Sequence, residues 1–218
     1  MNNHSVIFIE HPEVEYERLN RPETIYKKNK LVAYFLVSPL ELPQRILSSF
    51  IPPIFGNNSK KVYVDLVGPL IALILLASIL QYGHANKLPK ALILTSPTIA
   101  LLYYITFVPI ACLIAAKVGN ANLSPPKILA LLGYGLYGHL FTVIISLLFG
   151  LSNGLFFTVM VLLGGTSCFK IVLVLLLTIP KPVCRLLICS LVSIFHLLFL
   201  VFIHFAYMHK TFVYGINS

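Results

Sequence analysis

Residues 65–82 read DLVGPLIALILLASILQY, an aspartate followed by a long run of apolar side chains. Asp65 is also the last acidic residue: all seven Asp and Glu residues lie at or before it, whereas Lys and Arg continue as far as Lys210. Soluble domains rarely extend this far without a carboxylate. Transmembrane helices do, because a charge at the bilayer centre costs about 2.5–3.5 kcal/mol on insertion scales. The sequence therefore predicts a membrane protein with several spans.

The composition supports this prediction and argues against nucleic-acid binding. The 218 residues are 58% hydrophobic and 11% charged, whereas soluble domains are roughly half apolar and a quarter charged. The net charge of +9 comes from basic residues scattered at the edges of apolar runs. Such spacing suits lipid headgroups better than a phosphate backbone. We expect membrane lipid as a partner and no nucleic acid.

Five apolar runs approach or exceed the roughly 20 residues that a bilayer crossing needs. They are residues 66–82, 91–116, 128–150, 155–178 and 186–207. The links between them are short, which predicts antiparallel packing of consecutive helices. The expected fold class is all-α, a polytopic bundle of five transmembrane helices.

This bundle is expected to fill residues 62–207, between a polar N-terminal region at 1–61 and a tail at 208–218. Most Lys and Arg residues near span ends lie on the side of the N-terminal region, so the positive-inside rule predicts a cytosolic N-terminus and a lumenal C-terminus. The Asn-x-Ser/Thr sequons at Asn3, Asn57 and Asn122 then face the cytosol, and we expect them to carry no glycan.

Residues 40–53 read LELPQRILSSFIPP and precede the first span. Their apolar side chains recur at near-helical spacing, and Pro52 and Pro53 end the pattern. This pattern predicts a short helix lying in the membrane interface. The alternative is a soluble linker with incidental periodicity.

Two charged residues deserve functional hypotheses. Asp65 is expected to cap the first span, where Gly68 and Pro69 follow in the first turns, with a partner contact or ion pair as the alternative. Lys170 is the basic residue inside a span. It can extend its amine towards the interface or pair with Asp65 on a neighbouring helix.

Glycine clusters predict where helices approach closely, because a missing side chain lets backbones touch. The positions concerned are Gly133, Gly135 and Gly138 in one span and Gly164 and Gly165 in the next. Tyr134 and Tyr137 lie three residues apart on one helix face, so their hydroxyls need partners inside the bundle or a place at its edge. Helix packing is favoured here over a ligand pocket.

His139, His196 and His204 lie within predicted spans, which raises a metal site or proton pathway as one hypothesis. No carboxylate accompanies them inside the spans, so imidazoles hydrogen-bonded across helices are the favoured interpretation. The sequence also lacks the common hydrolase and nucleotide-binding motifs. We therefore expect no catalytic residue, metal or cofactor, and no enzymatic activity.

The four cysteines, Cys112, Cys168, Cys184 and Cys189, lie within or beside apolar runs and have no metal-binding spacing. They are expected to be small buried hydrophobes, with palmitoylation of Cys184 as the alternative.

Several motifs together resemble one family. DLVGPL at residues 65–70 is similar to the DLYGP-type signature of the Yip domain family, five-span proteins named for interacting with Ypt/Rab GTPases. KILALLGYGLYGHLF at 127–141 resembles its third-span motif. LLGGTSCFK at 162–170 and LLFLVFIHFAYMHK at 197–210 resemble the fourth and fifth spans of its third vertebrate member, and YFLVSP at 34–39 resembles the block before the first span.

The resemblance implies residence in the early Golgi and traffic between the Golgi and the endoplasmic reticulum. It also implies association with another Yip-type protein, and binding of Rab-type GTPases or a role in Golgi maintenance. A scaffold or adaptor is therefore the leading hypothesis. The alternatives are a small transporter or channel, and a membrane-curvature shaper.

Overall fold

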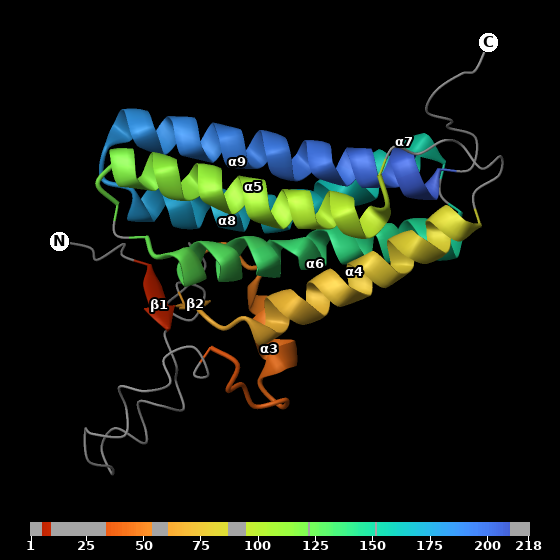
Figure 1. Cartoon of the computed structure of the whole chain (residues 1–218), viewed down its shortest axis with the longest axis horizontal. Helices are drawn as coiled ribbons and strands as arrows, with labels where there is room; N and C mark the ends of the chain where they lie inside the picture. Colours follow the sequence, from red (N-terminus) through yellow and green to blue (C-terminus); the bar gives the residue numbers. More distant parts are fainter. Residues whose placement is uncertain are drawn as a thin grey trace.

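The computed structural model describes residues 6–9, 34–53, 61–86, 95–121, 123–150 and 152–209. Five helical segments of this part of the chain are long and apolar enough to cross a membrane (Figure 1). They are α4 (Val67–Ala85), α5 (Pro97–Val118), α6 (Pro125–Phe149), the segment Asn153–Thr178 and the segment Pro182–Met208. The prediction of an all-α, five-span membrane protein is confirmed.

The last two spans are each built from more than one helical element. The fourth consists of α7 (Asn153–Val159), a π-helical turn η2 (Met160–Gly164) and α8 (Gly165–Thr178). The fifth consists of α9 (Pro182–Ile203) and a second π-helical turn, η3 (His204–Met208). Lys170 lies inside α8 and does not interrupt it. The fourth span is therefore one crossing, as predicted, with a π turn that the apolar pattern did not indicate.

Local sequence signals set where the helices begin and end. Pro97, Pro125 and Pro182 lie at the first helical positions of α5, α6 and α9, where a missing N–H costs little. The Ser96 hydroxyl accepts a hydrogen bond from the N–H of Ile99 and so caps α5. Gly150 ends α6 with φ = 54°, a left-handed conformation that glycine adopts without strain.

Helix α6 is the centre of the bundle. Within its most apolar stretch, 78% of the residues are buried, against 28–39% in the other four spans. Helices α4, α5 and α8 all contact it, and Figure 1 shows it running between them. Its glycines explain this position, because a helix surrounded on all sides needs small residues where its neighbours cross.

Helix α4 is shorter than its neighbours and begins part-way along α6. Its first turn packs against Gly133 and Tyr134, which lie about 13 Å from the start of α6 at 1.5 Å per residue. We call the end of the bundle formed by Val118, Pro125, Thr178 and Pro182 the proximal end; it is on the left in Figure 1. At the proximal end, the place beside α6 is taken by the segment before α4.

This segment contains α3 (Leu42–Ser48) and β2 (Lys61–Tyr63), which pairs in parallel with β1 (Ile7–Ile9). Ile7 lies opposite Lys61, and Ile9 lies opposite Tyr63. The sequence did not predict this two-stranded pairing. The helix expected within residues 40–53 is present but is limited to the seven residues of α3.

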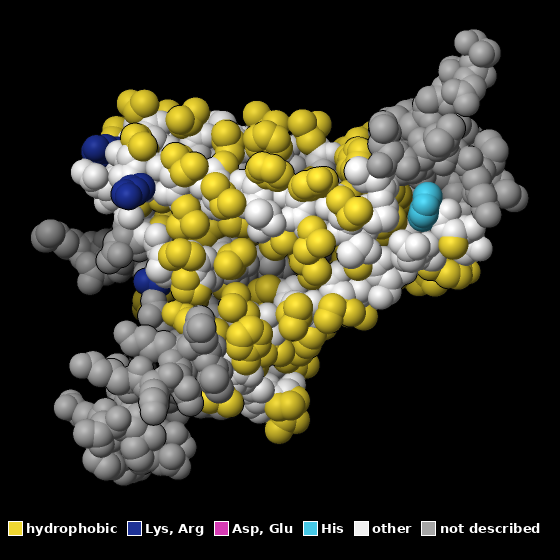
Figure 2. Space-filling model, in the orientation of Figure 1, with side chains coloured by type: hydrophobic (Ala, Val, Ile, Leu, Met, Phe, Trp, Pro, Cys, Tyr) yellow, Lys and Arg dark blue, Asp and Glu magenta, His cyan; other side chains and the backbone are white. Residues whose placement is uncertain are grey.

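The outer surface of the bundle is apolar. Figure 2 shows hydrophobic side chains spread over the visible face, with Lys and Arg side chains at the proximal end. An apolar groove of about 740 Å³ runs between α5 and α9. Its lining includes Ala100, Ala111, Phe107, Phe195 and Leu198.

Candidate functional site

A buried ion pair joins the segment before the first span to the start of that span. The Arg45 guanidinium donates to Asp65 over 2.9 Å (Nη1 to Oδ2) and to Glu41 over 2.6 Å (Nη2 to Oε2). The side chains of Arg45 and Asp65 are 2% and 6% exposed, whereas that of Glu41 is 47% exposed. The Arg45 guanidinium also lies 4.9 Å over the ring of Tyr63. This contact fixes α3 and β2 to the bundle.

The charge of Arg45 is maintained by its partners. Burial alone lowers the pKa of Arg45, but the hydrogen bonds to Glu41 and Asp65 and the nearby Asp65 charge raise it, so the pKa lies above its ordinary value. Arg45 is therefore positive at every physiological pH.

Asp65 accepts hydrogen bonds from three elements. Besides Arg45 on α3, the hydroxyl of Tyr134 on α6 donates to it, 2.8 Å to Oδ2 and 3.0 Å to Oδ1. The N–H of Gly68 in the first turn of α4 donates to Oδ1 over 3.1 Å. The expected capping role and the alternative of an ion pair are thus both present. Asp65 connects α3, α4 and α6, and we call Arg45, Asp65 and Tyr134 the junction cluster.

Tyr137 extends the contact between α4 and α6. Its hydroxyl donates to the carbonyl of Gly68 over 3.0 Å. Both tyrosines of the third-span motif are buried; Tyr134 bonds to Asp65 just before α4, and Tyr137 bonds to the first turn of α4. Gly68 itself faces Tyr134, and Pro69 faces Gly133, so closely that an added Cβ on either glycine would overlap its neighbour. This packing requires glycine at both positions.

Three of the four other predicted glycines lie in close contact with a neighbouring side chain, and Gly165 does not. An added Cβ would overlap Ile171 at Gly135, Ser167 at Gly138 and Leu200 at Gly164. At Gly165 the nearest atom is the carbonyl oxygen of Met160 at 3.9 Å, an ordinary contact within the same span. Within the described part of the chain, Gly164 therefore makes the close approach to α9, and Gly165 makes no close contact with another span.

Lys170 does not pair with Asp65. It is 4% exposed, and its Nζ donates to the carbonyl of Ser48 at the end of α3. Asp65 is already bonded to Arg45. Lys170 therefore ties α8 to α3 through a backbone oxygen, and among the described residues no carboxylate lies within ion-pair distance of it.

The three histidines of the spans are buried and hydrogen-bonded across helices, as predicted. His139 Nε2 donates to the carbonyl of His196 over 2.9 Å, and His196 Nδ1 shares a hydrogen bond of 2.5 Å with the Tyr104 hydroxyl. His204 Nδ1 lies 3.5 Å from the Ser146 hydroxyl. In the part of the chain that the structure describes, no three His, Cys, Asp or Glu side chains gather in a way that could hold a metal ion.

A family model described as the YIPF3 C-terminal domain matches residues 39–208. The chain belongs to the Yip family. The family assignment predicted from the order of the motifs is confirmed, and the match includes α3, the junction cluster and all five spans. No solved structure matches the chain.

The sequence analysis did not identify two members of this arrangement. The interfacial helix predicted within residues 40–53 gave Arg45 no partner, and the carbonyl of Ser48 has no sequence signal. Arg45 is the charged residue of the otherwise uncharged stretch 42–59, and Asp65 opens the following span; this pair of opposite charges was a usable indication of the ion pair.

Several predictions lie outside the described residues. They are the sequons at Asn3, Asn57 and Asn122, most of the polar region at 1–61, and the tail beyond residue 209. Of the cysteines, Cys112, Cys168 and Cys189 are buried and Cys184 is half-buried, all as free thiols.

Proposed function

We propose that this Yip-family protein is a scaffold or adaptor of the early Golgi membrane that acts in traffic between the endoplasmic reticulum and the Golgi and in Golgi maintenance. The family match over residues 39–208 is the observation that carries this proposal, because it includes every span and the segment docked before them. The proposed orientation places the N-terminus and the proximal end in the cytosol and the C-terminus in the lumen.

The junction cluster supports an adaptor role for the cytosolic segment. Arg45 and Asp65 hold α3 and β2 against α4 and α6. A protein that binds this segment therefore contacts an element rigidly connected to the spans. We propose Rab-type GTPases as candidates for such a ligand.

The groove between α5 and α9 is the surface that we propose for a partner Yip-type protein. Small residues at Ala100 and Ala111 let a partner helix approach, and Phe107 and Phe195, 65% and 50% exposed, provide large side chains to pack against it. Filling this groove should weaken the association without disturbing the α4–α6 contact on the other side of the bundle.

The test is recovery of a second Yip-type protein on mild detergent extraction of the tagged full chain. Ala111→Phe fills the groove and should reduce recovery several-fold. Ile74→Phe is the matched control, because Ile74 is 53% exposed on α4, away from the groove. Equal recovery with both variants would exclude the groove. Absence of any Yip-type partner, together with residence outside the Golgi by fluorescence microscopy, would refute the proposed function.

Helix α3 favours membrane shaping as a second candidate function. Its charged residue Arg45 faces the bundle, whereas Leu40, Leu47 and Ile51 around it are 91%, 66% and 46% exposed. We propose that these side chains enter one leaflet at the interface, as the sequence predicted. Purified protein that tubulates liposomes without a partner, and a Leu47→Glu variant that does not, would support this function.

A further inference from the structure

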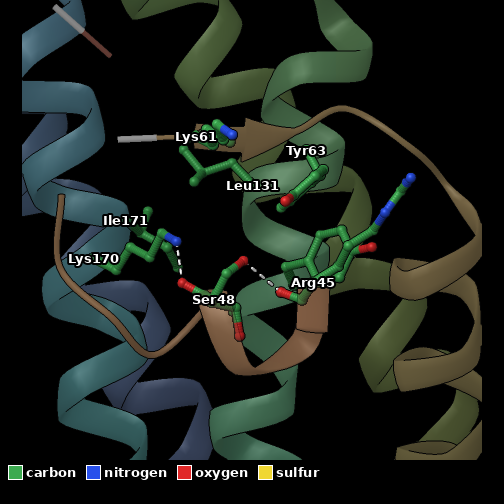
Figure 3. Close-up of a pocket in the computed structure, with 11 residues that line it drawn as sticks. Arg45, Ser48, Lys61, Tyr63, Leu131, Lys170 and Ile171 are labelled. Atoms are coloured by element: carbon green, nitrogen blue, oxygen red, sulfur yellow. Dashed lines mark hydrogen bonds between the residues drawn. The ribbon is translucent and has the colours of Figure 1, made fainter. Parts of the chain in front are cut away.

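A small cavity lies where α3, β2, α6 and α8 meet, next to the junction cluster. Its lining includes Ser48, Lys61, Tyr63, Leu131 and Lys170. Figure 3 shows Lys170 reaching in from α8 towards Ser48, with Lys61 on β2 beyond Leu131. The cavity has about 20 Å³ of room for the centres of water-sized atoms, and about 330 Å³ of empty space when its mouth is included.

Lys170 is a buried cation without a counter-charge in the described residues. It is 4% exposed, and its ammonium has three N–H donors, of which the carbonyl of Ser48 accepts one. A carbonyl oxygen satisfies a donor but does not neutralise a charge. Burying a charge is costly unless it is paired, so this ammonium favours an anion beside it.

The other cations of the cavity do not neutralise this positive charge. Lys61 is half-buried, and its side chain has no hydrogen bond or ion pair among the described residues. Arg45 also lines the cavity, but Glu41 and Asp65 are both bonded to it. Its Nε remains a buried donor without a partner in the described part of the chain. The cavity therefore presents donors and positive charge, with its nearby carboxylates already engaged.

We propose that this cavity binds oxygens of a phosphate group, supplied by the headgroup of an anionic lipid or by a soluble phosphate. Phosphate oxygens accept charge-assisted hydrogen bonds from Lys and Arg and further hydrogen bonds from hydroxyls such as that of Tyr63, which also lines the cavity. The room inside accepts one or two oxygen atoms, and the rest of the group lies in the mouth.

The position of the cavity fits a lipid headgroup as well as a soluble ion. Lys170 lies about 12 Å from the proximal end of α8, at 1.5 Å per residue. Because α4 begins part-way along α6, the described residues that cover this level on one side of the bundle belong to α3 and β2. A headgroup beside α3 can therefore reach the mouth from the membrane boundary. This inference is independent of the proposed trafficking function.

The experiment measures ligand-induced shifts in the thermal unfolding midpoint of the purified full chain. One arm adds sodium phosphate to protein in an uncharged detergent, with sodium chloride at equal ionic strength as the reference. The other arm compares nanodiscs of phosphatidylcholine with nanodiscs that also contain phosphatidic acid, which carries a phosphate monoester. We expect stabilisation in at least one arm. A shift in the detergent arm identifies soluble phosphate as sufficient, and a shift in the nanodiscs alone identifies the lipid.

Three variants test whether the shift in the unfolding midpoint comes from binding in this cavity. Lys170→Met should abolish the shift, and Lys61→Gln should weaken the apparent affinity on the order of tenfold. Lys181→Met is the matched control, because Lys181 also donates to a backbone carbonyl, that of Val118, but is exposed. It should keep the shift. If Lys170→Met does not fold, Lys61→Gln and the control decide the question by themselves.

Three results would overturn the proposal. One is the absence of a shift in both arms. Another is a chloride shift as large as that of phosphate, which would reflect general ionic strength. The last is a shift that Lys61→Gln and Lys170→Met both retain in full, which would place the anion elsewhere on the protein.

Discussion

Replacing Asp65 with asparagine should destabilise the bundle, because it removes the charge that neutralises Arg45. The amide keeps the size of the side chain and an oxygen that can accept the N–H of Gly68. Arg45 then remains 2% exposed with Glu41 alone as its carboxylate partner, and Glu41 is 47% exposed. Removing one partner of a buried pair costs about 3–5 kcal/mol. Since Glu41 compensates in part, we expect the free energy of unfolding to fall by about 2–3 kcal/mol.

The assay is reversible unfolding of the purified full chain in mixed micelles, followed by circular dichroism as the denaturing detergent increases. Tyr134→Phe removes the hydroxyl that donates to Asp65 and should cost about 1.5–3 kcal/mol. Tyr82→Phe is the matched control, since Tyr82 is 61% exposed; it should stay within about 0.5 kcal/mol of the parent.

A double-mutant cycle tests whether the ion pair itself is responsible. Asp65→Asn combined with Arg45→Met should cost less than the sum of the two single variants by about 1 kcal/mol or more, because residues in contact are coupled. A loss below about 0.5 kcal/mol for Asp65→Asn, or additivity within that range in the double variant, would refute the reasoning.

Three further predictions test the packing, the histidine network and the orientation. Gly138→Ala should destabilise the bundle by about 1–3 kcal/mol, because its Cβ would overlap α8, whereas Gly154→Ala has open space around it and should be neutral or slightly stabilising; thermal unfolding compares the two. Tyr104→Phe leaves a buried imidazole nitrogen without its partner and should cost about 1–3 kcal/mol in the same measurement, and no loss would show that this contact is unimportant. An engineered sequon within residues 87–94 should be glycosylated in cells and one within residues 119–124 should not, with the mobility shift after glycosidase treatment as the readout; the opposite pattern would reverse the proposed orientation.

Much of the fold could be read from the apolar runs alone. The predicted first span at residues 66–82 compares with α4 at Val67–Ala85, and the third at 128–150 compares with α6 at Pro125–Phe149. In a bilayer, every backbone group must bond within its own helix, so length and hydropathy decide which residues form spans. The sequence also indicated the central place of α6, because glycines at positions such as Gly133 and Gly138 allow close neighbours on several sides.

The candidate site could be predicted from the sequence only in part. Asp65 and Tyr134 were each singled out, yet nothing in the sequence connects two residues 69 positions apart. Pairing Lys170 with Asp65 was a reasonable hypothesis from charge alone, but Asp65 faces Arg45 and Lys170 faces the carbonyl of Ser48. A backbone acceptor has no sequence signature.

The sequence by itself determined that this chain crosses a membrane five times and where each crossing lies, because the apolar interior of a bilayer selects each helix by its own length and hydropathy. The order of the motifs also determined the family. Only the tertiary structure decided that α4 starts part-way along α6, that α3 turns Arg45 inward, and that Lys170 is left beside a cavity with no acidic partner in the described residues. Those outcomes depend on which helices touch and at what depth. Shape complementarity between apolar surfaces fixes that choice, and hydropathy does not encode it.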